Sequence, residues 1–411
     1  MVSTESKYEG VETMYYCGID IAKRKHEASV IGESGRLLAK SFPVVNSAEG
    51  AAVLFGFFKE HGIDKDGVII GMEATGHYWL ALYSYLTEAG YDVKVINPIQ
   101  SDAFRKMYIR QTKNDSKDSF IIAQVMRFGE FKTTELSEER IIALRQLSRY
   151  RLNLVESIGD CKRRIISLLD QVFPEYADLF SDIFGMASLE LLKKYPSPDE
   201  LADVPTKQLT RFLSKVSKGR FKESKARELK AVARGSFGVS FAKDAFAFQI
   251  KQIVEQLVFL DEQTEALDGE IGVLMKELSS PITTITGIGP VLGAAILGEI
   301  GDINRFSHPS KLVAFSGLDA KVVQSGEFTG TQGKMSKRGS PYLRRAIWLA
   351  ANVAASHDPT MSEYYSSLRN RGKHHYVAIS ALARKMCNII FAIMTENKPY
   401  DPLYQKRIKE A

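Results

Sequence analysis

The sequence has few of the residues that crosslink secreted proteins and no segment typical of a membrane protein. Its three cysteines, Cys17, Cys161 and Cys387, lie far apart in 411 residues and show no metal-ligand spacing, which favours a reducing, intracellular setting. No uninterrupted apolar run approaches the roughly 20 residues of a membrane span. The polar N-terminal segment lacks the apolar core of a signal peptide. We therefore expect a cytoplasmic protein with no membrane partner.

The chain is long enough for two or three domains, and its composition is that of an ordinary globular protein. It is 45% hydrophobic and 25% charged, with a mild net charge of +6. The positive charges are unevenly spread: residues 207–234 carry ten Lys or Arg against two Glu, and residues 334–345 carry five against none. Such runs are usually solvated faces, but they can also bind phosphates.

Residues 13–135 alternate strand and helix signals. Short apolar runs bounded by turn residues predict strands, and apolar residues at helical spacing predict helices. The expected strands are 15–20, 26–31, 37–42, 67–73 and 92–96, and the expected helices include 48–61 and 78–89. Three strands in a meander, followed by alternating helix and strand, is the order of the ribonuclease-H-like fold. We therefore predict an α/β domain of that fold.

Four acidic residues fall on elements that this fold brings together. Asp20 and Glu73 end apolar runs, while Asp115 and Asp118 are three apart at the start of a helical pattern and share one face. A carboxylate at a buried strand end is costly unless a cation is held there, and Mg²⁺ prefers carboxylate, water and phosphate oxygens. The four acids therefore predict a Mg²⁺ site, with Mn²⁺ as a possible substitute. The plainer interpretation of each helix Asp is a first-turn acid favoured by the helix dipole.

Residues 136–280 read as mostly helical and end in a heptad pattern. Apolar residues recur there at alternating steps of three and four, at Ile250, Ile253, Leu257, Leu260, Thr264, Leu267, Ile271, Leu274 and Leu278. This is the seam of a coiled coil, and it fits equally well a helix packed within its own chain or one that joins two protomers. The basic run that precedes it, which includes Lys225 and Arg227, is predicted to bind phosphates.

Residues 281–400 form a third, mostly helical segment. It opens with Thr286-Gly-Ile-Gly-Pro290, which is similar to the turn of a helix-hairpin-helix whose backbone N–H groups can hold a phosphate. Next come Gln324-Ser325-Gly326 and the second basic run, whose cations are Lys334, Lys337, Arg338, Arg344 and Arg345. Small residues around these cations would let the backbone approach a phosphate closely. The closing helix, 376–394, is apolar on so broad a face that we expect it in the core.

Several short motifs occur in one order along the chain. They are Gly18-Ile-Asp20-Ile-Ala-Lys23, Glu73-Ala-Thr-Gly76, Ile96-Asn-Pro98, Lys113-Asn-Asp115-Ser-Lys-Asp118, Gly287-Ile-Gly289, Phe315-Ser-Gly-Leu318, Gln324-Ser325-Gly326, and Ser336-Lys-Arg-Gly339 with Leu343-Arg-Arg-Ala346. Together they resemble the DEDD-type transposases of bacterial insertion sequences, the IS-one-ten family, whose relatives include the Piv-type DNA invertases. The segment from about 173 to 237 departs from the shorter family members.

The resemblance implies a RuvC-like N-terminal domain, a coiled-coil middle and a C-terminal transposase domain. It implies that Asp20, Glu73, Asp115 and Asp118 bind Mg²⁺ and that a serine of the C-terminal domain attacks DNA. Ser325 is the expected nucleophile, and Ser316 is a second candidate because the family often has alanine there. The implied partners are donor and target DNA, a structured bridge RNA, and further copies of the chain in a homodimer or homotetramer. Lys113 joins the residues expected to bind nucleic acid, in a bacterial, nucleoid-associated protein.

Two other functions also fit these residues. The acids could serve a RuvC-like, Mg²⁺-dependent nuclease in which water attacks the phosphate. Alternatively, the chain could be a non-enzymatic scaffold that binds RNA or DNA on a decayed nuclease fold. A covalent protein–DNA adduct that survives denaturation would distinguish the serine recombinase from both.

Overall fold

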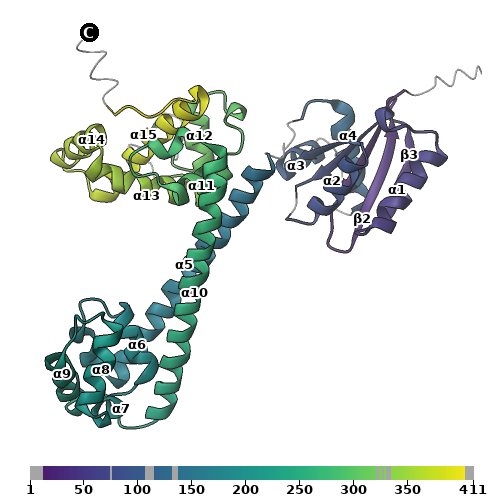
Figure 1. The fold of residues 1–411 in the computed structure, drawn as a ribbon. Helices are drawn as coiled ribbons and strands as arrows, with labels where there is room; N and C mark the ends of the chain where they lie inside the picture. Colours follow the sequence, from purple (N-terminus) through teal and green to yellow (C-terminus); the bar gives the residue numbers. More distant parts are fainter. Residues whose placement is uncertain are drawn as a thin grey trace, which may run out of the picture. The chain divides into compact units, whose positions relative to one another are not determined.

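The computed structural model describes most of the chain and divides it into two compact units. The described residues are 13–74, 76–106, 115–131, 138–320, 324–325, 328–329 and 335–402. The first unit spans residues 1–136 and the second spans residues 137–411. Figure 1 shows the helices and strands of each unit.

The first unit is built on a mixed five-stranded sheet with the order β3-β2-β1-β4-β5. Its elements are β1 (Tyr15–Asp20), β2 (Lys25–Gly32), β3 (Leu37–Val45), α1 (Ala48–Glu60), β4 (Val68–Glu73), α2 (Trp79–Glu88), β5 (Asp92–Ile96), α3 (Pro98–Arg105) and α4 (Asp115–Phe128). The pairs β1–β2 and β2–β3 are antiparallel, and the pairs β1–β4 and β4–β5 are parallel. This is the ribonuclease-H-like topology, so the fold predicted for this segment is confirmed.

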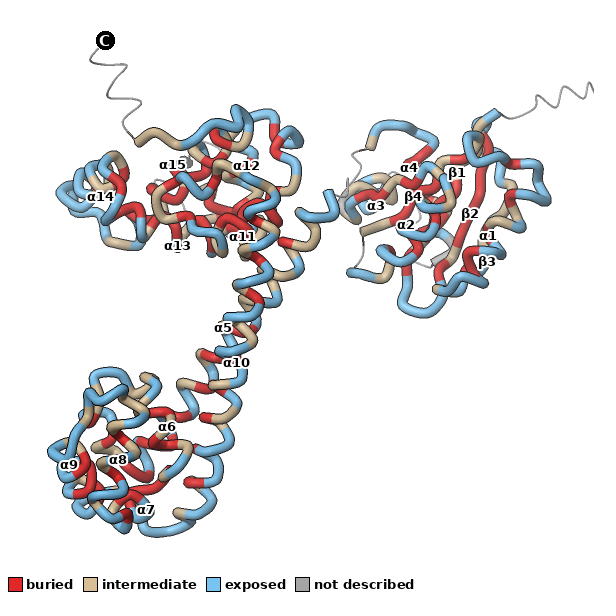
Figure 2. The backbone as a smooth tube through the Cα atoms, viewed as in Figure 1, coloured by how far each residue is buried: buried red, intermediate tan, exposed pale blue. Residues whose placement is uncertain are grey.

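Period two along the strands gives the sheet two different faces. Cys17 and Ile70 belong to the core cluster that includes buried residues of α1 and α2. Tyr16 and Ile69, one position earlier on each strand, instead pack with buried residues of α4. Figure 2 shows the central strands as the buried layer of this unit.

Helix α4 packs on its face of the sheet with its backbone almost touching β1. A Cβ added to Gly18 would lie 2.1 Å from the carbonyl oxygen of Ser119 and 2.3 Å from the amide nitrogen of Ala123. The Ser119 hydroxyl also pairs with the Ser29 hydroxyl of β2 at 2.7 Å. Only glycine allows this approach, so Gly18 fixes the position of α4 on the sheet.

Within its described residues, the second unit is helical apart from a short antiparallel pair of strands and an isolated β-bridge. Its main elements are α5 (Glu139–Val172), α6 (Met186–Lys194), α7 (Pro198–Asp203), α8 (Thr206–Val216), α9 (Glu223–Arg234), α10 (Lys243–Leu278), α11 (Pro290–Ile300), α12 (Pro309–Ser316), β6 (Gln324–Ser325), β7 (Phe328–Thr329), α13 (Pro341–His357), α14 (Pro359–Asn370) and α15 (His375–Glu396). Helices α5 and α10 pack side by side, and the lobe of α6–α9 connects them (Figure 1). The end of α5 meets the segment before α10, where the Val239 amide donates to the Gln171 carbonyl at 2.9 Å. The two long helices are therefore antiparallel.

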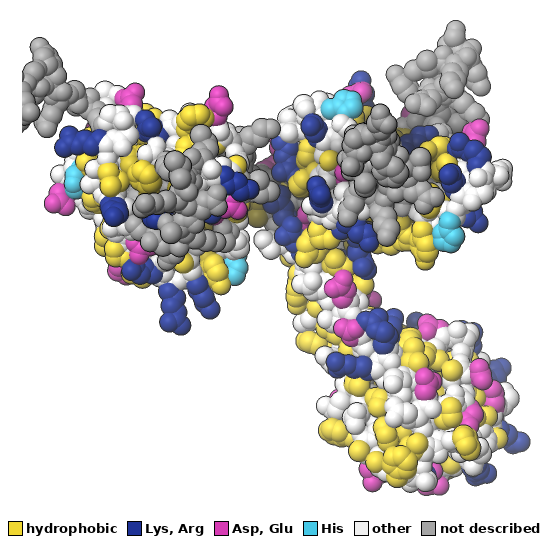
Figure 3. All heavy atoms as spheres, turned by 180° about the vertical axis from the view of Figure 1, so that it is seen from behind, with side chains coloured by type: hydrophobic (Ala, Val, Ile, Leu, Met, Phe, Trp, Pro, Cys, Tyr) yellow, Lys and Arg dark blue, Asp and Glu magenta, His cyan; other side chains and the backbone are white. Residues whose placement is uncertain are grey.

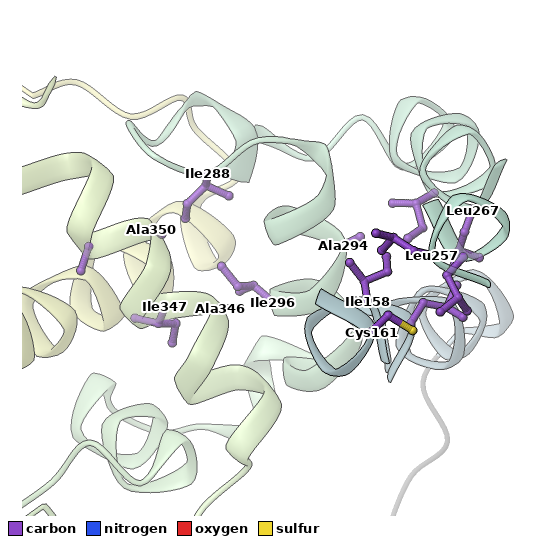
Figure 4. Packing of buried hydrophobic residues seen from close by; sticks show 14 of the residues in the cluster. Ile158, Cys161, Leu257, Leu267, Ile288, Ala294, Ile296, Ala346, Ile347 and Ala350 are labelled. Atoms are coloured by element: carbon purple, nitrogen blue, oxygen red, sulfur yellow. The ribbon is translucent and has the colours of Figure 1, made fainter. Parts of the chain in front are cut away.

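The heptad residues of α10 find their partner within the chain. Five of the predicted seam positions are buried: Ile250, Leu257, Leu260, Leu267 and Ile271. They belong to one core cluster with buried residues of α5, as Figure 4 shows for Leu257 and Leu267 near Ile158 and Cys161. Of the two interpretations of the heptad, packing within the chain is therefore the one found. The seam needs no second protomer, and the dimer or tetramer remains a prediction.

The closing helix, α15, has 22 residues and a mean hydropathy of 1.6 over its most apolar window, so its length and composition alone would allow it to cross a membrane. In the folded chain it packs against α12, α13 and α14. Leu382, Met386 and Ile390 of this helix are fully buried. The core location predicted for the closing helix is therefore confirmed.

The packing of α5 on α10 makes the seam important for stability. Leu257 is fully buried, whereas Phe259, on the same helix, is 56% exposed. We expect Leu257→Ala to lower the free energy of unfolding by about 2–5 kcal/mol through lost burial and a residual cavity. Phe259→Ala is the control and should change it by only about 0.5 kcal/mol. Urea denaturation measures both, and equal losses would contradict the observed seam.

Candidate functional site

Asp20 and Glu73 end neighbouring strands on the same face of the sheet. The parallel register pairs Ile19 with Met72, so Asp20 and Glu73 occupy the next positions, on strands about 4.8 Å apart. Along β1, Asp20 faces the same side of the sheet as Gly18, and along β4, Glu73 faces the same side as the residues that contact α4. Both acids are partly buried. The sheet thus brings two carboxylates together beneath the start of α4.

Asp118 lies on α4, the helix that covers this face. It is 6% exposed, and its neighbour Ser119 is the residue whose carbonyl meets Gly18. The close approach of α4 to β1 therefore carries Asp118 to the face on which the two strand-end acids lie.

Helix α3 contacts both Glu73, at the end of β4, and Asp118, on α4. The hydroxyl of Ser101 donates to Oε1 of Glu73, and Nη2 of Arg105 lies 3.0 Å from Oδ1 of Asp118. The two α3 residues are four apart and so lie on one face of the helix. Sequence analysis missed both, although a Ser and an Arg four residues apart, directly after β5, were a visible signal.

The structure describes the side chains of three of the four acids that were predicted to bind a metal ion together. Within the residues that the structure describes, no group of three His, Cys, Asp or Glu side chains is close enough to hold a metal ion. The side chain of Asp115 and the whole of Lys113 lie outside the described residues. Asp20, Glu73 and Asp118 share one face of the sheet. Joint metal binding by all four acids remains a prediction.

The available donor atoms fit a hard divalent cation. Asp20, Glu73 and Asp118 offer only carboxylate oxygens, the ligands that Mg²⁺ and Mn²⁺ accept. The Oδ1 atom of Asp118 is buried without a hydrogen-bond partner among the described residues, although the Arg105 guanidinium lies next to it. Thiolate ligands are not at hand, because burial raises the pKa of Cys17, the cysteine of β1.

His26 is a buried titratable group close to the strand end that carries Asp20. It is fully buried on β2, and its Nδ1 accepts a hydrogen bond from the Ala22 amide at 3.1 Å, in the turn that follows Asp20. Burial lowers the pKa of His26, and the nearby Asn46 side chain opposes this shift. The imidazole is therefore neutral, with its proton on Nε2, and it supports the turn after Asp20.

In the second unit, two glycine motifs that are far apart in sequence lock together. The Ser340 amide donates to the Phe315 carbonyl at 2.8 Å, and the Lys337 amide donates to the Gly317 carbonyl at 3.1 Å. A Cβ on Gly339 would lie 1.9 Å from the Phe315 oxygen, and Gly317 has φ +67°, in the left-handed region. We call residues 315–319 with 336–340 the glycine clasp. It closes the base of the segment that contains Ser325.

A buried acid ties the glycine clasp to the long helices. Glu299 of α11 is 5% exposed and receives two hydrogen bonds from Arg149 of α5, at 2.6 and 3.1 Å. The hydroxyl of Ser340, the N-cap of α13, donates to the same carboxylate at 2.7 Å. A buried carboxylate with these partners is fully satisfied, so it connects α5, α11 and the start of α13.

The two candidate nucleophiles, Ser325 and Ser316, and the nearby Ser336 differ in their surroundings. Ser325 lies on β6, opposite Phe328 of β7, and its side chain is outside the described residues. Ser316 is fully buried and donates to the Val313 carbonyl at 2.7 Å. Ser336 is also buried and donates to Asp319 of the glycine clasp. Ser316 and Ser336 therefore serve the packing of the clasp.

The cations of the second basic run line the start of α13. Lys337 and Arg338 are exposed, the Arg345 side chain is 48% exposed and lies 3.9 Å from Glu156, and Arg344 donates to the Ser316 carbonyl at 3.2 Å. Lys334 lies outside the described residues. Figure 3 shows Lys and Arg side chains on the surface of this unit.

The first basic run divides into structural and exposed cations. Lys225 is 15% exposed at its side chain and lies over the Phe180 ring, with its Nζ donating to the Leu179 carbonyl. Lys230 is buried and donates to a backbone carbonyl. Arg227 is 74% exposed and pairs with Glu223 on its own helix. The remaining cations of the run are exposed: Lys207, Arg211, Lys215, Lys218, Arg220, Lys222 and Arg234.

The predicted helix-hairpin-helix turn has a packing role. Residues 281–284 before it form a short 3-10 helix, and Pro290 begins α11 after it. Gly287 has φ +91°, and a Cβ there would lie 2.5 Å from the Ala350 oxygen of α13. Glycine is therefore required for contact with α13, and phosphate binding at this turn remains a prediction.

Two family models match the chain. A DEDD transposase model of the IS110 type matches residues 17–174, the segment that contains all four acids, and the model "Transposase IS116/IS110/IS902 family" matches residues 279–366, which contain Ser325 and the glycine clasp. The chain belongs to this transposase family. Membership identifies this transposase as an enzyme of DNA recombination.

Similar proteins cover nearly the whole transposase. The "Insertion element IS116 uncharacterized 44.8 kDa protein" of Streptomyces clavuligerus is 24% identical over 94% of this chain and 96% of its own length. The "Pilin gene-inverting protein" of Moraxella bovis is 22% identical over 96% of this chain and 99% of its own. A structure of T. thermophilus RuvC in complex with Holliday junction substrate matches 29% of this transposase and 99% of that chain, with 17% identity and a TM-score of 0.23.

Because His26 is buried in its neutral form, the stability of the first unit should decrease at acidic pH. Its pKa is lowered in the folded chain, so the unfolded chain binds the extra proton more readily. The free energy of unfolding should therefore fall as the pH drops below about 6.5, the ordinary histidine pKa. Well above that pH, His26 should have no effect on the free energy of unfolding. His26→Gln should reduce this pH dependence, and His61→Gln, at an exposed position, should keep it. Urea denaturation between pH 5 and 8 measures the difference, and identical profiles for wild type and His26→Gln would contradict it.

Proposed function

We propose that this transposase cleaves and rejoins DNA through a serine nucleophile, Ser325, assisted by a divalent metal ion at Asp20, Glu73, Asp115 and Asp118. The observation that carries the proposal is the placement of Asp20 and Glu73 at adjacent parallel strand ends, on the face covered by the helix of Asp118. Partly buried carboxylates on one face are stable when they share a cation. Mg²⁺ is the natural choice for oxygen ligands beside a phosphate, and Mn²⁺ can replace it.

The chain's own residues divide the work of the reaction. When bound, the metal ion stabilises the charge that develops on the phosphate. The Ser325 oxygen attacks phosphorus and loses its proton, and the bond from phosphorus to one deoxyribose oxygen breaks, leaving a free hydroxyl on that DNA end. The phosphodiester energy stays in the serine–phosphate bond, so rejoining needs no external energy. The cations near the glycine clasp would bind the DNA backbone and stabilise the negative charge on the phosphate.

The choice of Ser325 over Ser316 is supported by the burial of Ser316. Ser316 is fully buried and hydrogen-bonded within α12, with the Cys387 sulfur 3.8 Å away. It could reach DNA only if the glycine clasp opened. Ser325 lies in the short hairpin whose base the clasp fixes, between residues 320 and 335, which form an isolated bridge.

The acids and the serine belong to different units. Asp20, Glu73 and Asp118 lie in residues 1–136, and Ser325 lies in residues 137–411. We propose that each working site combines the acids of one protomer with the serine of another, in a homodimer or homotetramer. An isolated chain would then cut DNA poorly, which couples the chemistry to assembly. A structured bridge RNA would choose the donor and target DNA, bound by the exposed cations of the two basic runs.

Covalent trapping tests the roles of the serine and the acids. Wild-type protein with Mg²⁺ and donor DNA should give a protein–DNA adduct on denaturing gels. Ser325→Ala should bind DNA and give no adduct, while Asp20→Asn and Glu73→Gln should lose strand cleavage and keep the circular dichroism of the folded chain. Mixing Ser325→Ala with Asp20→Asn protein should restore partial activity, because some sites receive intact acids and an intact serine from different chains.

The outcomes separate the alternatives. Full cleavage by Asp20→Asn protein would refute the acidic site, and an adduct formed by Ser325→Ala would move the nucleophile elsewhere. Metal-dependent cleavage without any adduct would favour the RuvC-like nuclease that uses water. DNA or RNA binding without cleavage would favour the non-enzymatic scaffold. No recovery on mixing would place each site within one chain.

Salt dependence tests the cations beside the glycine clasp. Lys337 and Arg338 are exposed there, and Lys251 on α10 is an exposed control. Lys337→Ala with Arg338→Ala should weaken binding to all DNA sequences and reduce the slope of log affinity against log salt by roughly 0.7 to 0.9 per lost phosphate contact. Lys251→Ala should leave the slope unchanged. Fluorescence anisotropy from 50 to 300 mM salt measures both, and an unchanged slope for the double variant would make these cations a solvated surface.

A further inference from the structure

Asp118 already has a positive partner in the folded chain. Nη2 of Arg105 lies 3.0 Å from its Oδ1, and both side chains are largely buried, at 16% and 8% exposure. Nη1 of the same guanidinium lies 2.5 Å from Asp102 on its own helix. A buried carboxylate needs such a partner, because an unpaired charge is costly away from water.

The pairing is incomplete on both sides. The Nε of Arg105 and the Oδ1 of Asp118 are buried without a hydrogen-bond partner among the described residues. The ion pair therefore supplies opposite charge without the forked hydrogen bonds that make an Arg–carboxylate pair strong. A charge partner held in this way can be exchanged for another cation at modest cost.

We infer that Arg105 is an internal counter-charge that occupies Asp118 until a divalent ion replaces it. The inference rests on the proposed metal site, and it makes α3 a positioning element for that site. Ser101 would keep its hydrogen bond to Glu73 from the same helix face, so the exchange would need only the Arg105 side chain to turn away. The guanidinium and the metal ion then compete for one carboxylate, and each lowers the affinity of the other.

Metal binding to the full chain tests this competition. Mn²⁺ binding is followed by electron paramagnetic resonance of the free ion, without DNA and without turnover. Arg105→Met should bind Mn²⁺ roughly tenfold more tightly than wild type, within the 5- to 150-fold range usual for coupled sites. Arg105→Lys, which keeps the charge, should stay close to wild type. Arg127→Met is the control on α4, where the side chain contacts Gln124 and not the acids, and it should leave the affinity unchanged.

Thermal unfolding gives a second reading of the same exchange. Without metal, Arg105→Met should melt at a lower temperature than wild type, because Asp118 is left unpaired. With saturating Mn²⁺ the difference should largely disappear, since the ion takes the place of the guanidinium. A purely structural ion pair would instead lower the melting temperature equally in both conditions. Arg105→Gln, which removes the charge but keeps a polar side chain on this face of α3, replaces the Met variant if that chain does not fold.

Two failures can be told apart. If Mn²⁺ fails to bind wild-type protein, or binds it and Asp20→Asn protein alike, the metal site itself is wrong and the proposed function loses its cation. If wild-type binding depends on Asp20 but Arg105→Met binds with unchanged or weaker affinity, only the counter-charge role is overturned. In the Asp118→Asn background, Arg105→Met should no longer tighten binding, and tightening there would also overturn the role.

Discussion

The first unit depends on the close contact between the backbone of α4 and the backbone of β1 at Gly18. The space for this contact exists only because Gly18 has no side chain. Helix α4 cannot retreat without breaking the hydroxyl pair of Ser119 and Ser29 and exposing Ile122 and Met126, which are buried beneath it. Asp118 is carried to the acidic face as a consequence. A backbone packing requirement thus determines where a carboxylate lies.

In the second unit, the equivalent constraint is the buried carboxylate of Glu299. Its two oxygens are shared between Arg149 of α5 and Ser340 at the start of α13. A buried charge that loses one of these partners becomes unstable, so α5, α11 and the glycine clasp hold their relative positions together. The glycine clasp joins the two ends of the segment that contains Ser325.

Much of this organisation could be predicted from the sequence. The strand pattern at 15–20 and 67–73 was clear because buried strands are short, apolar and bounded by turns. The ribonuclease-H-like order then assigned Asp20 and Glu73 to strands that meet at one site. The heptad of α10 was also clear, but its partner was not, because an apolar seam records the need for burial and not the identity of the neighbouring helix. The contacts of Ser101 and Arg105 with the acids escaped prediction for a related reason. These contacts join segments that are distant in sequence, so the spacing of the two residues on α3 did not identify their partners.

The lobe of α6–α9 enters and leaves the α5–α10 pair at a single point. A Cβ on Gly238 would lie 2.0 Å from the carbonyl oxygen of Val172, so the two ends of the intervening segment are in backbone contact. Because the two ends of the lobe already touch, a short turn could join α5 to α10 with almost no additional entropic cost of loop closure. The lobe also packs against the helix pair, because α6 contacts α10 and the buried residues of the lobe share one core cluster with those of α5 and α10. The same junction could accept an unrelated domain with adjacent termini, which makes the tip of the helix pair a natural grafting point for a new binding specificity.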